Sequence, residues 1–125
     1  MAVQAPPVYK LKSFVINSGN IINAMAQVVL EKDGGEVLGF SMGDGPVDAA
    51  FRSIENIVGR HFELDDFKIS AVTEGREAVG SSVVRLRSNG KLYSGKGVST
   101  DIIGAAIRAY INALNKICYE EEEKE

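Results

Sequence analysis

The chain has 125 residues, of which 45% are apolar and 25% charged, and its formal net charge is −3. This length predicts one domain with a core of its own. No basic stripe indicates a nucleic-acid partner, and no apolar run approaches the roughly 20 residues that span a bilayer, so we expect neither nucleic acid nor a membrane as a partner. The single cysteine, Cys118, excludes an internal disulfide and favours a reducing, cytoplasmic location.

The first half of the chain has the pattern of three strands and a helix, after a predicted linker at residues 1–8. An alternating segment at residues 9–19 predicts the first strand. The stretch "AQVVLEKDGGEVLGFSMGDG" then predicts a hairpin that turns at Asp33-Gly34-Gly35, because type I′ turns need positive φ at both central residues and Asp-Gly pairs supply it. One face of the helix that follows is apolar; its members are Val47, Ala50, Phe51, Ile54 and Val58.

The second half of the chain repeats this order. Residues 65–75 alternate as a strand, and "SSVVRLRSNGKLYSGKG" predicts a hairpin that turns at Asn89-Gly90. A helix is predicted over roughly 100–117, with its polar residues restricted to a narrow strip. The closing "EEEEKE" at 120–125 is predicted to be a solvated acidic tail or frayed helix.

The repeat predicts an α+β fold made of two βββα units related by a pseudo-twofold axis, with antiparallel sheets and the helices packed on one side. The first unit spans about residues 9–60 and the second about 64–118, within a domain at 9–119. The second helix is more apolar than one sheet face requires. It is therefore expected to contact the other helix or a dimer partner, or to be deeply buried.

Each unit places two glycines near the predicted start of its helix, as Gly43-x-Gly45 and Gly95-x-Gly97. Pro46 suits the first helical position, and Ser99 or Thr100 is the predicted N-cap of the second helix. Free N–H groups and the helix dipole make such a start a possible anion site. Taken alone, the pattern favours glycines that only let a strand turn into a helix.

Carboxylates beside these helix starts change that interpretation. Asp44 and Asp48 flank the first start and Asp101 lies at the second. An anion site next to a carboxylate suits a zwitterion, which is an amino acid. Compensation of the helix dipole remains the better explanation for at least one of the three.

The sequence gives little support for catalysis or for a metal site. It has no Ser-His-Asp set and no His, Asp or Glu cluster with metal-ligand spacing. The single histidine, His61, follows the first helix and is predicted to be a cation at its C-terminal end. A small enzyme that uses Asp48 and His61 would require the two side chains to converge.

Three stretches resemble the C-terminal regulatory domain of the 2-isopropylmalate synthases, which the citramalate synthases share. They are "GDGPVDAAFRSI", "DDFKISAVTEGREAVGSSVVRL" and "GKGVSTDIIGAAIRAYINALN". The resemblance runs from about Tyr9 to Ile117, and its last stretch leans toward 2-isopropylmalate synthase. It implies two βββα units, the order already seen in the repeat. Gly104 departs from the acidic residue that the family pattern has at that point.

The resemblance implies a domain that binds leucine, or isoleucine in some citramalate synthases, and thereby inhibits a separate TIM barrel. That barrel condenses acetyl-CoA with a 2-oxo acid and would hold the divalent metal, so no cofactor and no catalytic residue is expected in this chain. A homodimer with effector sites near its interface is also implied. Asp48 should face the ammonium group, and helix-end amides the carboxylate. The implied ligand-binding residues are Gly43, Gly45, Val47, Asp48, Leu64, Phe67, Ala71, Gly97, Thr100 and Ile102.

Two alternatives stay open. One is an isoleucine-sensing domain of a citramalate synthase, since a methyl position in an apolar pocket is worth only about 1–3 kcal/mol. The other is a dimerisation module without a ligand, in which the glycines are purely structural and the apolar second helix is the dimer seam.

Overall fold

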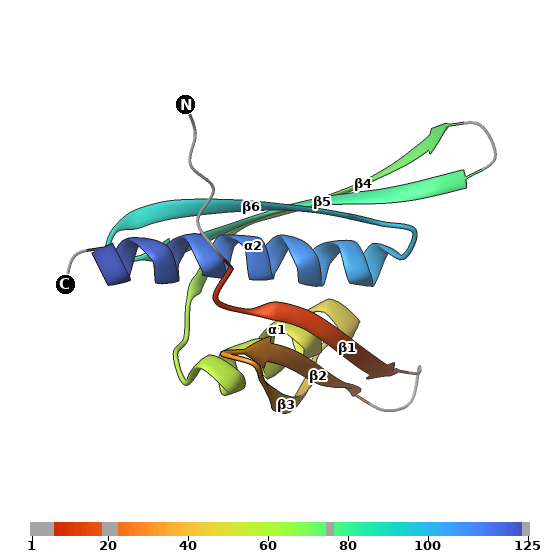
Figure 1. Cartoon of the computed structure of the whole chain (residues 1–125). Helices are drawn as coiled ribbons and strands as arrows, with labels where there is room; N and C mark the ends of the chain where they lie inside the picture. Colours follow the sequence, from red (N-terminus) through yellow and green to blue (C-terminus); the bar gives the residue numbers. More distant parts are fainter. Residues whose placement is uncertain (1–6, 19–22, 75–76, 124–125) are drawn as a thin grey trace.

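The computed structural model describes residues 7–18, 23–74 and 77–123, without the side chains of 71–74, 77–78 and 122–123. It confirms the predicted order of three strands and a helix, twice (Figure 1). The elements are β1 (Lys10–Asn17), β2 (Ala24–Lys32), β3 (Gly35–Gly43), α1 (Pro46–Val58), β4 (Glu63–Glu74), β5 (Glu77–Ser88), β6 (Lys91–Ser99) and α2 (Ile102–Glu123). The strands form two antiparallel sheets, which we call the first sheet (β1-β2-β3) and the second sheet (β4-β5-β6).

The two helices lie between the two sheets. α1 packs mainly on β2 and β3, and α2 packs mainly on β5 and β6. Figure 1 shows α2 between the second sheet and β1, with α1 and α2 running in the same direction, so that both helices begin on the same side of the molecule. The centre of the core joins the units, because the ring of Phe51 lies 4.5 Å from that of Tyr110 and 5.6 Å from that of Phe67.

The two units match closely in backbone. β3 and β6 both have nine residues, and each helix begins three residues after its strand ends. Both hairpins turn through two residues of positive φ, Asp33 (54°) and Gly34 (79°) in the first unit and Asn89 (53°) and Gly90 (77°) in the second. These are the predicted type I′ turns.

The glycines of the second unit have a different position from the predicted one. Gly95 and Gly97 lie inside β6, where an added Cβ would come within 2.1 Å of the Ala109 carbonyl and 2.2 Å of the Ala105 carbonyl. They let α2 rest directly on the strand. The counterpart of Gly95, the fifth residue of its strand, is Gly39 in β3, so the predicted pairing of Gly43-x-Gly45 with Gly95-x-Gly97 is wrong by four positions.

α2 continues beyond the predicted end at Ile117 to Glu123, so much of the predicted tail is helical. Glu121 forms an ion pair with Arg60 at 2.7 Å, and Glu120 forms one with Lys91 at 2.7 Å. Nearly all of the apolar surface of α2 is buried within the chain. Its apolar character therefore reflects deep burial between the units, and a dimer seam along α2 is not needed to explain it.

The start of β1 is held by α2. The side-chain oxygen of Asn115 accepts hydrogen bonds from the backbone N–H groups of Val8 (3.1 Å) and Tyr9 (2.9 Å). Val8 therefore belongs to the packed structure, although it lies within the predicted linker; residues 1–6 of that linker lie outside the described residues. Among the described helices, none has the length and apolar character needed to cross a membrane.

Candidate functional site

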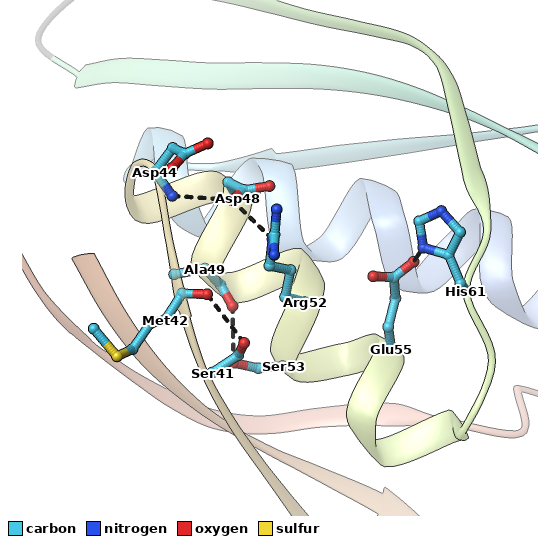
Figure 2. A network of polar contacts seen from close by, with 9 residues as sticks. All are labelled: Ser41, Met42, Asp44, Asp48, Ala49, Arg52, Ser53, Glu55 and His61. Atoms are coloured by element: carbon cyan, nitrogen blue, oxygen red, sulfur yellow. Dashed lines mark hydrogen bonds and ion pairs between the residues drawn. The ribbon is translucent and has the colours of Figure 1, made fainter. Parts of the chain in front are cut away.

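The start of α1 combines an open helix end with an ion pair. Gly45 is the N-cap in an extended conformation, Pro46 begins the helix as predicted, and no side chain caps the first turn. Asp48 Oδ2 accepts a hydrogen bond from the Asp44 N–H at 3.0 Å and pairs with Arg52 Nε at 3.0 Å (Figure 2). This end of the helix therefore presents backbone donors, a carboxylate and a guanidinium close together.

The start of α2 is closed by its own side chain. Asp101 accepts hydrogen bonds from the N–H groups of Ile103 at 3.2 Å and Gly104 at 3.3 Å, and so it is the N-cap. The prediction that Ser99 or Thr100 caps this helix is wrong; the Ser99 hydroxyl instead accepts a hydrogen bond from the Asp101 N–H. The two helix starts are therefore not equivalent as anion sites.

A bulge in β4 decides which side chains face α1. The register shifts between Leu64 and Asp66, which leaves Asp65 as an extra residue. Leu64 and Phe67, three positions apart, thereby come to the same inward face. In a strand without a bulge, residues three positions apart lie on opposite faces. The sequence alone did not show which arrangement β4 has.

A groove of about 260 Å³ runs between α1 and the start of β4. Its lining residues come from α1, the following loop, β4 and α2; they are Asp48, Phe51, Arg52, Glu55, His61, Phe62, Leu64 and Tyr110. Phe51, Phe62 and Tyr110 are buried, and Leu64 is 44% exposed although it faces inward. The groove therefore has an apolar floor and a charged rim along one face of α1.

Tyr110 is a buried polar group in this groove. Its side chain is 2% exposed, and its hydroxyl has no hydrogen-bond partner among the described residues. Burial, and secondarily the negative charge of Glu55, raise the pKa of Tyr110 well above its ordinary value, so the phenol stays neutral. The hydroxyl is thus a buried polar group beneath the floor of the groove.

His61 lies at the far end of the groove from Asp48. Its Nδ1 is 2.7 Å from Glu55 Oε2, and the imidazole is 84% exposed (Figure 2). It therefore pairs with a side chain of the helix rather than with the terminal carbonyls, whose cap is Gly59 in the left-handed conformation. Glu55 follows Asp48 by seven residues, about 10 Å along the helix axis, so Asp48 and His61 are not within hydrogen-bond reach of each other.

The remaining predicted site residues fall into three groups. Val47 packs partly against the core at the start of α1, and Phe67 packs on Phe51 beside the groove. Thr100 and Ile102 lie at the start of α2, where Ile102 touches Gly80 of β5, the residue paired with Ala71. The side chain of Ala71 lies outside the described residues. Gly43 is closely packed against Ala49 and Asp48, and Gly97 lies under α2, so both have packing roles.

Five groove residues were not predicted from the sequence to belong to a site: Phe51, Arg52, Glu55, Phe62 and Tyr110. Arg52 had a usable signal, because a residue four positions after Asp48 shares its helix face. Tyr110 had none, since it reaches the groove from the other unit. Within the described ranges, no three His, Cys, Asp or Glu side chains gather closely enough to hold a metal ion.

Comparison with known protein families gives one match that covers nearly the whole chain. Residues 1–118 match the model of the LeuA allosteric (dimerisation) domain. The chain belongs to this family. The resemblance read from the three sequence stretches is thereby confirmed.

Individual relatives agree with this assignment. The chain is 43% identical over 114 residues to the 2-isopropylmalate synthase of Ruminiclostridium cellulolyticum, covering 91% of this chain and 22% of the relative. It is 42% identical over 120 residues to that of Clostridium kluyveri, covering 96% of this chain and 23% of the relative. The chain therefore spans less than a quarter of the length of these relatives.

Proposed function

We propose that this chain is the regulatory domain of a 2-isopropylmalate synthase and binds leucine in the groove beside α1 as a feedback inhibitor. The observation that carries the proposal is the Asp48–Arg52 pair at the open start of α1, next to an apolar floor. A free amino acid has the matching pattern of an ammonium group, a carboxylate and a side chain.

Each part of leucine has a counterpart in this groove. Asp48 accepts hydrogen bonds from the ammonium group, while Arg52 and the uncapped amides of α1 bind the carboxylate. The isobutyl group lies against Phe51 and Leu64, and Phe67 extends this wall along β4. The groove volume of about 260 Å³ suits a single amino acid better than a drug-sized ligand, whose pockets measure roughly 300–1,000 Å³.

The parent protein would supply the chemistry. In it, a catalytic barrel outside this chain condenses acetyl-CoA with 2-oxoisovalerate, using a divalent metal, in the cytoplasm. The regulatory domain pairs with a second copy, and Thr100 and Ile102 close the effector site from the start of α2. Inhibition then corresponds to a coupling free energy between effector and catalytic sites of about 1–3 kcal/mol.

Calorimetric titration of the folded chain with leucine, isoleucine and valine tests the proposal. We expect leucine to bind most tightly. Tighter binding of isoleucine would instead favour the sensing domain of a citramalate synthase. If none of the three amino acids produces heat, the sensing function is wrong and the ligand-free dimerisation module is the better description.

A matched pair of variants separates the proposed site from general effects of charge. Asp48→Asn should weaken leucine binding about 10- to 100-fold, because a hydrogen bond to a charged group is worth about 1.5–3 kcal/mol. Asp65→Asn is the control, since Asp65 also pairs with an arginine, Arg87, at 2.9 Å, but on the β4 bulge. Equal losses in both variants would contradict the assignment of Asp48.

A further inference from the structure

The loop between α1 and β4, residues 59–62, contacts both units of the chain. Arg60 binds α2 of the second unit, whereas His61 and Phe62 are bound to α1 and line the groove. These three residues are consecutive, and consecutive Cα atoms are only about 3.8 Å apart. A movement on the groove side of the loop is therefore felt on its α2 side.

Glu55 of α1 fixes the groove side of this loop. Its Oε2 accepts a hydrogen bond from the Phe62 N–H at 2.9 Å and lies 2.7 Å from His61 Nδ1 (Figure 2). The Phe62 ring is 4% exposed and lines the same groove as Phe51 and Leu64, against which the isobutyl group of leucine is proposed to lie. The loop is thus part of the wall that a ligand in the groove would contact.

Arg60 fixes the other side of the loop to the end of α2. Its Nη1 donates to both carboxylate oxygens of Glu121, at 2.8 and 2.7 Å, and its Nη2 donates to the Ser88 hydroxyl at 3.2 Å. We call this set of contacts the clasp. The guanidinium carbon also lies 4.9 Å from the centre of the Phe62 ring, which is within cation–π range. Arg60 thus joins the floor of the groove to α2 without being one of the lining residues.

The same part of α2 holds the start of β1. Asn115 lies six residues before Glu121, about 9 Å along the helix axis. Its amide nitrogen donates to the Tyr9 carbonyl at 2.9 Å, in addition to the hydrogen bonds that its oxygen accepts from Val8 and Tyr9. Figure 1 shows the α1–β4 loop, the end of α2 and the start of β1 at one end of the molecule. The clasp therefore lies between the groove and the point where the chain enters the first sheet.

We infer that Arg60 is a positioning residue for the effector, because the clasp couples occupancy of the groove to the order of the α2 end and of the start of β1. The inference rests on the leucine site proposed above and adds how binding there acts on the rest of the domain. A ligand packed in the groove restricts the loop, and a loop that is already ordered loses less entropy on binding. By reciprocity, weakening the clasp weakens leucine binding by the factor by which leucine strengthens the clasp.

The clasp is more than an isolated surface ion pair. The Arg60 and Glu121 side chains are 41% and 38% exposed, and an isolated pair with such exposure contributes little. Here the guanidinium also binds the hydroxyl of Ser88, a buried residue, and lies over an aromatic ring, so three groups fix its position. The exposure still limits the size of the coupling, and we expect changes of a few-fold with the fold retained.

Backbone hydrogen exchange followed by NMR, together with calorimetric titration, tests the inference in the full chain. Arg60→Gln removes the clasp. Arg87→Gln is the control, because Arg87 pairs with Asp65 at 2.9 Å with similar exposure but on the β4 bulge. Without ligand, Arg60→Gln should speed exchange of the Tyr9 and Phe62 N–H groups about two- to five-fold, and the control should not. Leucine should slow exchange of the Tyr9 N–H in the wild type but not in Arg60→Gln, which should also bind leucine about two- to five-fold more weakly.

Glu121→Gln approaches the clasp from its other side. It should reproduce the effects of Arg60→Gln, and the double variant should be no worse than either single variant, because each change removes the same contact. Arg60→Lys keeps the charge without the guanidinium fork and should recover part of the wild-type behaviour. Circular dichroism checks that each variant is folded.

Three results would overturn the inference. One is exchange at Tyr9 and Phe62 that is the same in Arg60→Gln as in the wild type, or that changes equally in the Arg87→Gln control. Another is a double variant whose losses add, which would mean that Arg60 and Glu121 act separately. The last is equal leucine affinity in the wild type and in Arg60→Gln. A wild type that binds no amino acid contradicts the proposed function instead, and exchange in the ligand-free protein then still decides whether the clasp couples the loop to β1.

Discussion

The two βββα units of this chain share one backbone plan and differ in the chemistry placed on it. Both have a type I′ hairpin, a bulged first strand and a helix resting on glycine. They differ at the helix start. The N-cap of α1 is Gly45, which has no side chain to bind the first N–H groups, whereas the N-cap of α2 is Asp101, whose carboxylate binds them. They also differ on the sheet faces that point away from the helices. That of the first sheet is mainly apolar, whereas that of the second mixes Leu92 and Val98 with ion-paired charges such as Asp66 and Arg85. The shared features determine the fold, and the difference at the helix starts is where we propose that a ligand binds.

Substitution of the glycines beneath the helices, a feature that both units share, is expected to change the free energy of unfolding most. Gly95→Ala would place a Cβ 2.1 Å from the Ala109 carbonyl, and Gly39→Ala would place one 2.2 Å from the Ser53 carbonyl. Both contacts are with backbone, so the helix must move off the strand. We expect each variant to lose about 3 kcal/mol of the free energy of unfolding in urea, at the upper end of overpacking effects.

Gly35→Ala is the control for these variants, because its new Cβ would meet only the Lys32 carbonyl at 3.7 Å. It should change the free energy of unfolding by less than about 0.5 kcal/mol. If Gly39→Ala were as mild as this control, the close approach of α1 to β3 would be wrong.

The core position occupied by Tyr110 differs between the two units. It is the ninth residue of α2, and the ninth residue of α1 is the apolar Ile54. Because burial raises the pKa of Tyr110 in the folded protein, the folded state keeps the phenolic proton that the unfolded state loses above about pH 10. The stability contributed by the neutral phenol is therefore complete below pH 10 and is lost as the pH rises above it.

The measurement is the free energy of unfolding of the wild type and of Tyr110→Phe at pH 8 and pH 11. The wild type should lose about 1.4 kcal/mol more than the variant over this interval. At pH 8 the variant should be as stable as the wild type or slightly more so, since it removes a buried hydroxyl without a partner. Parallel losses in the two proteins would show that the phenol ionises freely in the folded state.

Two substitutions reverse the difference between the helix starts, one by removing the N-cap side chain of α2 and one by adding such a side chain to α1. Asp101→Ala should lower the free energy of unfolding by about 1 kcal/mol, the usual effect of losing an N-cap. Gly45→Asp should raise it by a few tenths, because its side chain has open space and its backbone is extended. The same substitution should weaken leucine binding, since the new carboxylate occupies the amides proposed for the effector carboxylate. Unchanged leucine affinity in folded Gly45→Asp would place the effector carboxylate elsewhere.

The sequence predicted the shared plan better than the differences. Turn residues and alternation are local signals, so the hairpins, the strand order and the helices followed from them. The N-cap was misplaced because Ser99, Thr100 and Asp101 all have suitable side chains, and only the helix start decides among them. The bulge at Asp65 and the approach of Tyr110 depend on contacts between distant segments, which no local pattern records.

The last prediction concerns a hydrogen bond that both units share. Asn56 donates to the Phe40 carbonyl on β3, and Asn112 donates to the Lys96 carbonyl on β6. Replacement by alanine would mix the loss of the bond with the higher helix propensity of alanine, so aspartate, whose propensity is close to that of asparagine, is the better change. Asn56→Asp and Asn112→Asp should each lose about 1 kcal/mol in urea unfolding. The loss should be slightly larger for Asn56→Asp, because Asn56 lies in the last turn of α1, where the helix dipole disfavours a carboxylate. If only one variant loses stability, the hydrogen bond from helix to strand stabilises only one of the two units. The two units would then differ in how the helix is held on its sheet.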